Sequence, residues 1–450
     1  MVVTIVGGGL SGVLIAVNLI RYSEPRELKI YLIERNEVCE GIAFSSKEDS
    51  HYLNVPVEKM SLFPMEPEHF YFWLKEKGYD YSNTDFVSRC IYKEYIQNTF
   101  EEIAFANSEN VWLEVIKDES EDIVQENTGV TVLLKSGRTI RTDKVVLALG
   151  NLPPANPLIK DMGYTFCSGY TSNPWSESPF IKNNETVLMI GTGLTMVDMI
   201  MSLKEKGHAG KVFCLSRHGL LPHTHDLSQT YPQFNEALKN SYLLSEIFAT
   251  VKFQIKQAEK KGIKRFAVID SLRPYTQQLW QRFSLADKKQ FLRHLKPYWD
   301  ILRHRIPVQS SKIINELIQR GQLEILSGKY TKIEESATGF NVTFRNRKSG
   351  LLKSFNVNKI INCTGPTSDF ENTEEPFIKN LVQKKLICNA PAGLGINATA
   401  EGKILNFANQ ESEFLFTLGP PLKGILWEST AVPEISAQAE NLAKIILFEK

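Results

Sequence analysis

The sequence predicts an α/β fold in which a strand, a glycine-rich turn and a helix occur as a unit twice. The first unit opens the chain: an apolar strand at residues 2–6 enters a glycine-rich turn at residues 7–12, and an apolar helical stretch follows. The second unit repeats this order from an apolar run at residues 186–190. Helical periodicity across residues 226–306 predicts a helical insertion. Together these patterns indicate two Rossmann-like dinucleotide-binding domains with an insertion in the second.

Gly7, Gly9 and Gly12 match the G-x-G-x-x-G pattern in the structural context that the pattern requires. Gly7 permits the tight turn, Gly9 lets the backbone approach a pyrophosphate, and Gly12 allows close packing of helix and strand. The helix that begins here would present free N–H groups and the positive end of its dipole to that pyrophosphate. This turn therefore predicts the first nucleotide site.

An acidic residue ends the next predicted strand. Residues 28–33 are strand-like, and Glu34 follows 22 residues after Gly12. A carboxylate at this position accepts hydrogen bonds from the hydroxyl groups of a ribose. The alternative is an ordinary surface glutamate beside a glycine turn. The order of strand, turn, helix, strand and acid favours the nucleotide site.

The second glycine turn is a looser copy of the first. Gly191 and Gly193 occupy the first two glycine positions, but Met196 stands at the third. The following strand, at residues 211–215, leads to Arg217 rather than to an acid. An arginine suits the 2′-phosphate of NADP, which an acid would repel, so we expect NADPH here. The alternative for Arg217 is a solvated surface arginine.

Later segments repeat the pattern of the first domain, which indicates two dinucleotide-binding domains. The order of strand, glycine, loop and helix in the C-terminal part predicts that the chain returns there to complete the first domain. Apolar strands near residues 144 and 359 each run into a glycine, and the C-terminal segment ends in a predicted helix from about residue 432 to 448.

The insertion could form a lid or one wall of a substrate pocket; the alternative is a packing module with basic solvated faces. The predicted parts are a first dinucleotide-binding domain at residues 1–165 and 355–450, a second at residues 166–225 and 307–354, and the insertion at residues 226–306.

Composition excludes several classes of partner. The 450 residues carry a formal net charge of +1, so nothing predicts binding to nucleic acid or to an anionic membrane. No apolar run is long enough to span a membrane. Six scattered cysteines without a C-x-x-C pair disfavour a disulfide framework and a thioredoxin-reductase type of redox pair. We expect a cytoplasmic protein that acts on a small molecule.

Three sets of polar residues outside the glycine turns could bind a cofactor, a metal or an anion. Asn54 lies in a predicted loop and could place its amide against a flavin edge; the alternative is a structural turn asparagine. His223, His225 and Asp226 could hold a metal, but their spacing in a loop is weak evidence, so we predict no metal. The Arg-His-Arg run at residues 303–305 could clamp an anion, although arginine-rich helix ends are common. No catalytic residue can be assigned.

On these motifs the chain resembles the two-dinucleotide-binding-domain flavoproteins, and most closely a bacterial group of FAD/NAD(P)-binding proteins. The wider relatives of that group include flavin monooxygenases and amine N-hydroxylases, while the group itself implies no specific reaction. The resemblance runs from one end of the chain to the other. Its matching stretches are residues 7–12, 53–56, 191–198, 216–222, 303–305, 362–366 and 419–433.

The resemblance implies which residues bind each cofactor. FAD is implied at the first glycine turn, at the strand end that follows it, at the loop around residue 54 and at a closing turn near the C-terminus. NADPH is implied at the second turn and the arginine after it. The FAD residues are Gly7, Gly9, Ser11, Gly12, Glu34, Arg35, Asn54, Met60, Ser61, Leu418 and Gly419, and the NADPH residues are Gly191, Gly193 and Arg217.

One departure from the family pattern bears on the reaction. Flavin monooxygenases of the usual type carry Phe-x-Gly-x-x-x-His before the second glycine motif, whereas the corresponding segment here runs from Cys167 to Asn173, with asparagine in the histidine position. The difference argues against a Baeyer–Villiger type of reaction. We therefore expect an FAD-dependent oxidoreductase reduced by NADPH, with hydroxylation of a small molecule as the implied reaction. The alternatives are an NADPH-linked flavin reductase or dehydrogenase without oxygen insertion, and a non-catalytic FAD-binding protein.

Overall fold

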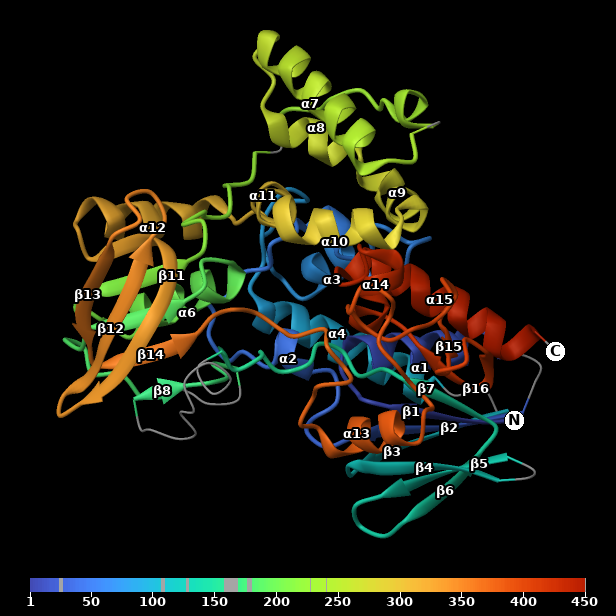
Figure 1. Cartoon of the computed structure of the whole chain (residues 1–450). Coiled ribbons are helices and arrows are strands. Elements are labelled where there is room, and N and C mark those ends of the chain that lie inside the picture. The colour runs from blue at the N-terminus through green and yellow to red at the C-terminus, as the bar shows by residue number, and fades with distance from the viewer. Residues whose placement is uncertain are drawn as a thin grey trace.

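A computed structural model describes residues 1–23, 27–106, 110–126, 129–157, 169–175, 180–226, 228–239 and 241–449. Two large sheets each carry one of the glycine turns, and a group of helices lies above them in the view of Figure 1. This arrangement confirms the predicted α/β fold with two Rossmann-like units. Among the described residues, no helix is both long enough and apolar enough to cross a bilayer.

The first sheet has six strands in the order β15-β16-β7-β1-β2-β3. β1 pairs in parallel with β2 and β7, so Val6 lies opposite both Ile33 and Leu147. These strands therefore end together, and the residues after them share one edge of the sheet. Four of the five β1 positions are buried, as expected for a parallel strand covered on both faces. The strands are β1 (Val2–Val6), β2 (Leu28–Glu34), β3 (Val111–Lys117), β7 (Lys144–Leu147), β15 (Lys403–Leu405) and β16 (Glu411–Thr417).

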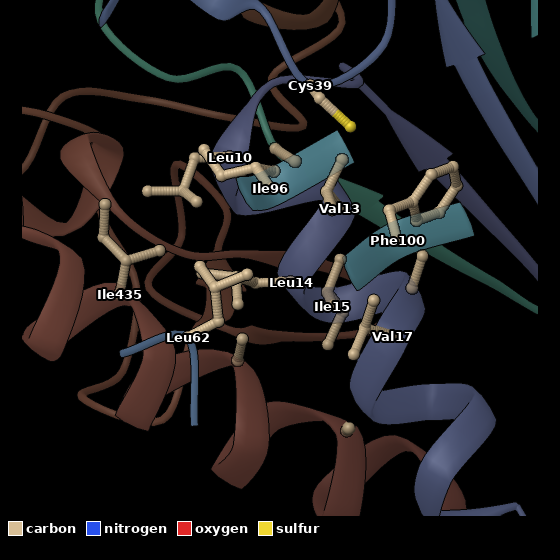
Figure 2. Close-up of a cluster of buried hydrophobic side chains, with 14 of the residues drawn as sticks. Leu10, Val13, Leu14, Ile15, Val17, Cys39, Leu62, Ile96, Phe100 and Ile435 are labelled. Carbon is tan, nitrogen blue, oxygen red and sulfur yellow. The ribbon is translucent and has the colours of Figure 1, made fainter. Parts of the chain in front are cut away.

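Helices α1 and α15 pack against each other within the main core of the first domain. Figure 2 shows this core, in which Leu10, Leu14 and Val17 of α1 lie among Ile96 of α4 and Ile435 of α15. The last helix of the chain thus returns to the domain that the first residues begin, because its apolar face completes the cover over α1. These helices are α1 (Leu10–Tyr22), α4 (Arg89–Phe105) and α15 (Val432–Phe448).

The second sheet has seven strands in the order β13-β12-β11-β10-β9-β14-β8. β14 pairs in parallel with β9, with Ile361 opposite Met189. We predicted that the first domain resumes at residue 355, but the second sheet continues to Asn362, because the apolar strand β14 fills a buried place beside β9. The strands are β8 (Tyr170–Thr171), β9 (Val187–Ile190), β10 (Val212–Ser216), β11 (Leu323–Ser336), β12 (Gly339–Asn346), β13 (Leu352–Val357) and β14 (Lys359–Asn362).

The region between residues 226 and 306 is helical, as its periodicity predicts. Its two ends meet, since Thr224 forms a parallel bridge with Ile306. We call the paired segments, residues 223–225 and 304–306, the neck of the insertion. In Figure 1, α7 and α8 project beyond both sheets, whereas α10 and α11 lie against the rest of the chain. The helices are α7 (Leu244–Lys260), α8 (Arg265–Ser271), α9 (Thr276–Arg282), α10 (Leu285–His294) and α11 (Lys296–Arg303), with 3-10 turns η2 (Asn235–Leu238) and η3 (Arg273–Tyr275).

Shorter elements complete the described fold. A three-stranded antiparallel sheet in the order β4-β5-β6 contains a hairpin around the turn at residues 135–137. Helix α6 follows the second glycine turn, as α1 follows the first. These elements are β4 (Ser120–Glu126), β5 (Gly129–Leu134), β6 (Thr139–Thr142), α2 (Gly41–Phe44), α3 (His69–Glu76), α6 (Leu194–Glu205), α12 (Val308–Gln319), α13 (Pro376–Gln383), α14 (Lys423–Leu426), η1 (Val57–Lys59) and η4 (Pro420–Leu422).

Candidate functional site

The first glycine turn is packed as closely as its glycines require. Gly7 has a φ of +103°, and a Cβ placed on it would lie 2.5 Å from the Ala148 carbonyl oxygen. A Cβ on Gly12 would lie 1.8 Å from the Gly7 carbonyl oxygen, so α1 rests directly on the turn. Gly9 is the N-cap of α1, and no side chain caps this end, which leaves N–H groups of the first helical turn for a ligand. The turn therefore fits the pyrophosphate of a dinucleotide.

Glu34 holds the end of β2 against this turn. Its Oε2 accepts the Gly8 backbone N–H at 2.7 Å, and its Oε1 accepts the Asn36 backbone N–H at 2.9 Å. Gly8 must be glycine for this contact, because a Cβ there would lie 2.7 Å from the Glu34 Cβ. Each carboxylate oxygen keeps a second lone pair, so Glu34 can still accept from a ribose hydroxyl. The predicted acid thus has a structural task that the sequence did not indicate, and its contact with a ribose stays a prediction.

The loop after β2 packs on the first turn. The Cys39 backbone N–H donates to the Gly8 carbonyl at 2.8 Å, and a Cβ on Gly9 would lie 3.4 Å from the Gly41 Cα. Arg35, at the start of this loop, forms ion pairs with two carboxylates of the chain. Its predicted contact with FAD would therefore be shared with these acids. The two partners, each at 3.3 Å, are Glu119 and Glu375.

A turn near the C-terminus closes over the start of α1. Gly419 has a φ of +75°, and a Cβ on it would lie 2.6 Å from Ser11 Oγ. The Gly419 backbone N–H donates to Gln438 Oε1 at 2.7 Å, which ties the turn to α15. The neighbouring Leu418 is fully buried. The structure thus brings together three predicted FAD-binding residues, Ser11, Leu418 and Gly419, from opposite ends of the chain.

The remaining predicted FAD residues lie in the loop before α3. The Asn54 carbonyl accepts a hydrogen bond from His225 Nε2 at 2.9 Å, so its loop contacts the neck of the insertion. Met60 and Ser61 are buried, and Ser61 Oγ donates to the Glu66 carbonyl at 2.7 Å. Ser61 and Leu418 also line a cavity of about 710 Å³ bordered by this loop, α9 and α15. These residues lie near one another, but each is already held by hydrogen bonds or packing with protein groups that the sequence did not predict.

The second glycine turn repeats the first glycine but not the third. Gly191 has a φ of +119°, and a Cβ on it would lie 2.2 Å from the Cys363 carbonyl oxygen. A Cβ on Gly193 would meet no heavy atom within 4 Å, so the turn is open at this point. Met196 is fully buried and belongs to the core beneath α6. The N-terminus of α6 has no side-chain cap, so this turn also offers free N–H groups.

Arg217 lies just past the end of β10 and is exposed. Its guanidinium donates no hydrogen bond to any residue that the structure describes. Burial lowers the pKa of the neighbouring His218, and Arg347 and Arg217 lower it further, so the two arginines lie near the same ring. The His218 ring in turn contacts Tyr298 of α11, with 5.8 Å between ring centroids. Two cationic side chains near the second turn fit a phosphate group.

A buried polar network joins the two dinucleotide-binding units, and sequence reasoning missed it. Asp198 of α6 accepts a hydrogen bond from Arg89 Nη2 at 2.8 Å, and both side chains are largely buried. His51 Nε2 lies 2.8 Å from Ser202 Oγ on the same helix. Burial raises the pKa of the Asp198 carboxyl, and Arg89 opposes that shift. The network fixes α6 against the first domain, and no local motif connects its members along the chain.

The two polar clusters meet at the neck of the insertion. No group of three His, Cys, Asp or Glu side chains in the described part of the chain is arranged to hold a metal ion. His225 lies on one segment of the neck and Arg305 on the other, where Arg305 Nη2 donates to Asp270 at 2.6 Å. Arg303 instead pairs with Glu428 at 3.3 Å. The three residues at 303–305 therefore do not act as one clamp.

The segment of the monooxygenase signature is described only in part. Cys167 lies outside the described residues. Asn173 is described, and its Oδ1 accepts the Trp175 backbone N–H at 3.2 Å, as turn asparagines often do. The five described cysteines are free thiols, and burial raises the pKa of Cys39, beside the first glycine turn, to about 12.

Comparisons with known proteins agree with the fold. Residues 4–152 match a family model described as FAD-NAD(P)-binding. The ornithine N-hydroxylase of Kutzneria sp. 744, solved with reduced FAD, NADP⁺ and L-ornithine, aligns with a TM-score of 0.64 and 13% identity, covering 99% of this chain and 98% of that one. L-lysine 6-monooxygenase from Pseudomonas syringae aligns with a TM-score of 0.65 and 14% identity over 99% and 98%. No curated protein matches the sequence.

A reductase shares the architecture as well. The bacillithiol disulfide reductase of Staphylococcus aureus aligns with a TM-score of 0.57 and 13% identity, covering 100% of this chain and 98% of that one. All three alignments span nearly the whole of both chains, so the likeness extends beyond the first domain. The chain therefore has the fold of the two-dinucleotide-binding-domain flavoproteins, and its residues 4–152 match the FAD-NAD(P)-binding model within the first domain.

Proposed function

We propose that this chain is an FAD-dependent oxidoreductase that takes electrons from NADPH and hydroxylates a small molecule. One observation carries the proposal: a single chain holds two uncapped glycine turns at the ends of parallel strands, with an acid after one and an exposed arginine after the other. The hydroxylation step is supported by the fold that the chain shares, along its length, with an ornithine N-hydroxylase and a lysine monooxygenase.

The first domain has the features that bind and orient FAD. The free N–H groups at the start of α1 would receive the pyrophosphate, and Glu34 would accept from the ribose. The flavin end would extend toward the closing turn at Gly419 and the loop of Asn54. When bound, FAD supplies the hydride acceptor and the reaction with oxygen. The chain itself would position the cofactor through these turns.

The second domain has the features that receive NADPH. The start of α6 would bind its pyrophosphate, and Arg217 would hold the 2′-phosphate through charge-assisted hydrogen bonds. The Arg89–Asp198 pair keeps α6 in a fixed relation to the first domain while nucleotides exchange. We infer that this pair positions the second cofactor and does not react.

A flavin reductase that never inserts oxygen is the second candidate, and the likeness to a disulfide reductase favours it. The thiols argue against disulfide chemistry. Cys39, Cys214 and Cys363 are buried, and burial raises the pKa of each, whereas the thiolate is the reactive form. Such a reductase would therefore act on another acceptor. The free thiols also support the cytoplasmic location that we propose.

Rapid mixing of the FAD-loaded protein with NADPH tests these proposals. Anaerobic NADPH should bleach the flavin absorbance, and flavin that NADPH cannot bleach would identify a non-catalytic FAD-binding protein. In air, a screen of amines, aldehydes and thiols should find a compound that stimulates NADPH turnover and yields one hydroxylated product per NADPH. Hydrogen peroxide as the sole product would identify the reductase. Protein that takes up no FAD on reconstitution would refute all three readings.

A further inference from the structure

The helical insertion carries a positive charge that the net charge of the whole chain conceals. Residues 226–306 contain fifteen lysines and arginines against seven aspartates and glutamates, which gives this region a formal net charge of +8. The rest of the chain therefore carries −7, because the 450 residues together carry +1. So strong a separation of charge within one chain indicates that the insertion meets an anionic partner.

Unpaired positive charge lies on the outward face of α7, in the part of the insertion that projects beyond both sheets (Figure 1). Lys252, Lys256 and Lys260 are exposed and four residues apart, so helical geometry aligns them in one row, and the exposed Lys261 follows. None of these four ammonium groups pairs with a residue that the structure describes. Like charges at this spacing repel one another, so an anionic surface that binds the row also relieves that repulsion.

The acidic residues near this lysine row do not neutralise it. Glu259, on the same helix, pairs with Arg265 at 3.2 Å. Asp226 pairs with Lys264 at 2.7 Å. Glu246 lies in the first turn of α7, at the opposite end from the lysines. The row therefore keeps its positive charge at the surface.

Two exposed phenylalanines border the lysine row. Phe248 is 47% exposed and Phe253 is 57% exposed, and the helical repeat places them on either side of the row. The opposite face of α7 is buried in the insertion, so the helix does not need the two phenylalanine rings for its own packing. Its buried residues are Leu244, Ile247 and Ala258. Large apolar side chains exposed beside unpaired cations mark a contact surface.

The chemistry of this face favours a lipid surface over a protein or a nucleic acid. All four unpaired cations are lysines, and each is a point charge on a long flexible stem, which suits phosphate groups without fixed positions. Protein interfaces are depleted in lysine, and sequence-specific nucleic-acid sites commonly use the planar fork of arginine. Phenylalanine on a lysine-rich helix can enter the boundary between lipid head groups and acyl chains.

We propose that the outward face of α7 docks this chain on a membrane that contains anionic lipids. The lysines bind the lipid phosphates, and Phe248 and Phe253 enter the membrane at the depth of the head groups. The contact is peripheral, so salt should weaken it. The two glycine turns belong to the sheets, so the docking face and the proposed nucleotide sites are separate surfaces. Docking therefore does not depend on the proposed reaction and can be tested whether or not that reaction occurs.

Sedimentation of the full chain, as purified, with lipid vesicles tests the proposal. We expect binding at low salt to vesicles of phosphatidylcholine mixed with phosphatidylglycerol, release as the ionic strength rises, and binding at least about tenfold weaker to phosphatidylcholine alone. Equal binding to the two kinds of vesicle would overturn the proposal, as would no binding to the anionic ones. Tighter binding to a single-stranded oligonucleotide than to the anionic vesicles would identify a nucleic-acid site instead.

A triple variant tests whether the lysine row makes the contact. Lys252→Gln, Lys256→Gln and Lys260→Gln together should weaken binding to the anionic vesicles on the order of a hundredfold, because each lysine close to an anionic surface contributes about fivefold. A matched control removes the same charge from exposed positions of the second domain and should bind normally. It combines Lys312→Gln, Lys348→Gln and Lys353→Gln.

A double variant tests the apolar part of the contact. Phe248→Ser with Phe253→Ser should weaken binding about tenfold and leave its salt dependence unchanged. Leu351→Ser with Leu352→Ser is the control, because these leucines are equally exposed but lie in the second domain. All the substituted side chains are exposed, so FAD content and thermal unfolding should match those of the unaltered chain. Anionic-vesicle binding that survives both the lysine and the phenylalanine changes would place the contact elsewhere and overturn the proposal.

Discussion

The two glycine turns start alike. In each, the first glycine has a left-handed φ and could not carry a Cβ, because a backbone carbonyl lies against it. In each, the following strand ends in a side chain that is tied to the second residue of the turn. Glu34 accepts from the Gly8 backbone, and Ser216 accepts from the Thr192 hydroxyl at 2.9 Å. Each turn is thus fixed to the strand that follows it, by a carboxylate in the first unit and by a hydroxyl group in the second.

Beyond that point the two turns diverge. The third position is Gly12 in the first turn, pressed against a carbonyl, and a buried methionine, Met196, in the second. The first turn is overlaid by the chain, with Gly41 next to Gly9, while nothing lies within 4 Å of the Cβ position on Gly193. We infer that the first turn retains a resident FAD and that the second admits an exchanging NADPH. Four experiments can break or sharpen this comparison.

The largest effect is expected from Gly12→Ala. The added methyl group would lie 1.8 Å from a backbone oxygen, so α1 must move away from the turn, and we expect loss of bound FAD and a destabilisation of about 3 kcal/mol or more. Gly193→Ala is the matched control, since its methyl group enters open space, and it should keep FAD and fold normally. Flavin absorbance per chain and thermal unfolding measure both. Equal losses in the two variants would contradict the comparison.

Met196→Gly restores the consensus glycine of the second turn, and we nevertheless expect it to destabilise the protein. Met196 is fully buried in the core beneath α6, so its removal leaves a cavity and adds a helix-interior glycine, at a cost of about 3 kcal/mol. Denaturant unfolding measures the loss. A neutral or stabilising effect would show that the packing around α6 relaxes to the geometry of the first turn.

Glu34→Ala removes the acceptor for two backbone N–H groups and, in our proposal, for the ribose. We expect a destabilisation of about 2 kcal/mol and weaker retention of FAD during gel filtration. Glu37→Ala is the control, because Glu37 is two-thirds exposed and forms a surface ion pair with Lys117 that contributes little to stability. Full FAD retention in Glu34→Ala would remove the acid from the cofactor site.

Arg217→Glu should have the smallest effect and act on one nucleotide. We expect the KM for NADPH to rise about tenfold, equivalent to about 1.4 kcal/mol, while the KM for NADH changes little. The side chain is exposed and donates no hydrogen bond to the described residues, so the unfolding transition should not move. Steady-state flavin reduction with each nucleotide gives the answer, and equal changes for both would exclude a 2′-phosphate contact.

Much of the first site could be predicted because its signals are local. Gly7, Gly12 and Glu34 stand at short, regular spacings around a strand, and a parallel strand pair forces their ends to one edge of the sheet. The same locality explains an error. The predicted boundary at residue 355 assigned the apolar run at residues 359–362 to the first domain, but the sequence of an apolar strand does not specify which sheet it joins, and this strand lies beside β9.

Contacts between distant segments could not be predicted. The pairing of Arg89 with Asp198 and the meeting of His225 with Arg305 at the neck depend on how the insertion and the two sheets pack. In the sequence the two polar clusters stand apart, and no pattern there indicates that they meet. Packing instead separates Arg303 from Arg305 and turns one histidine toward the loop of Asn54.

By itself, the sequence determined the strand–turn–helix units, the glycines that they require and the charge of the side chain that follows each unit. These features depend on backbone geometry and charge over a few residues. Only the tertiary structure decided which turn is covered and which is open, and which sheet receives each apolar strand. Those outcomes depend on side chains from distant segments competing for the same space, and short-range patterns do not encode that competition.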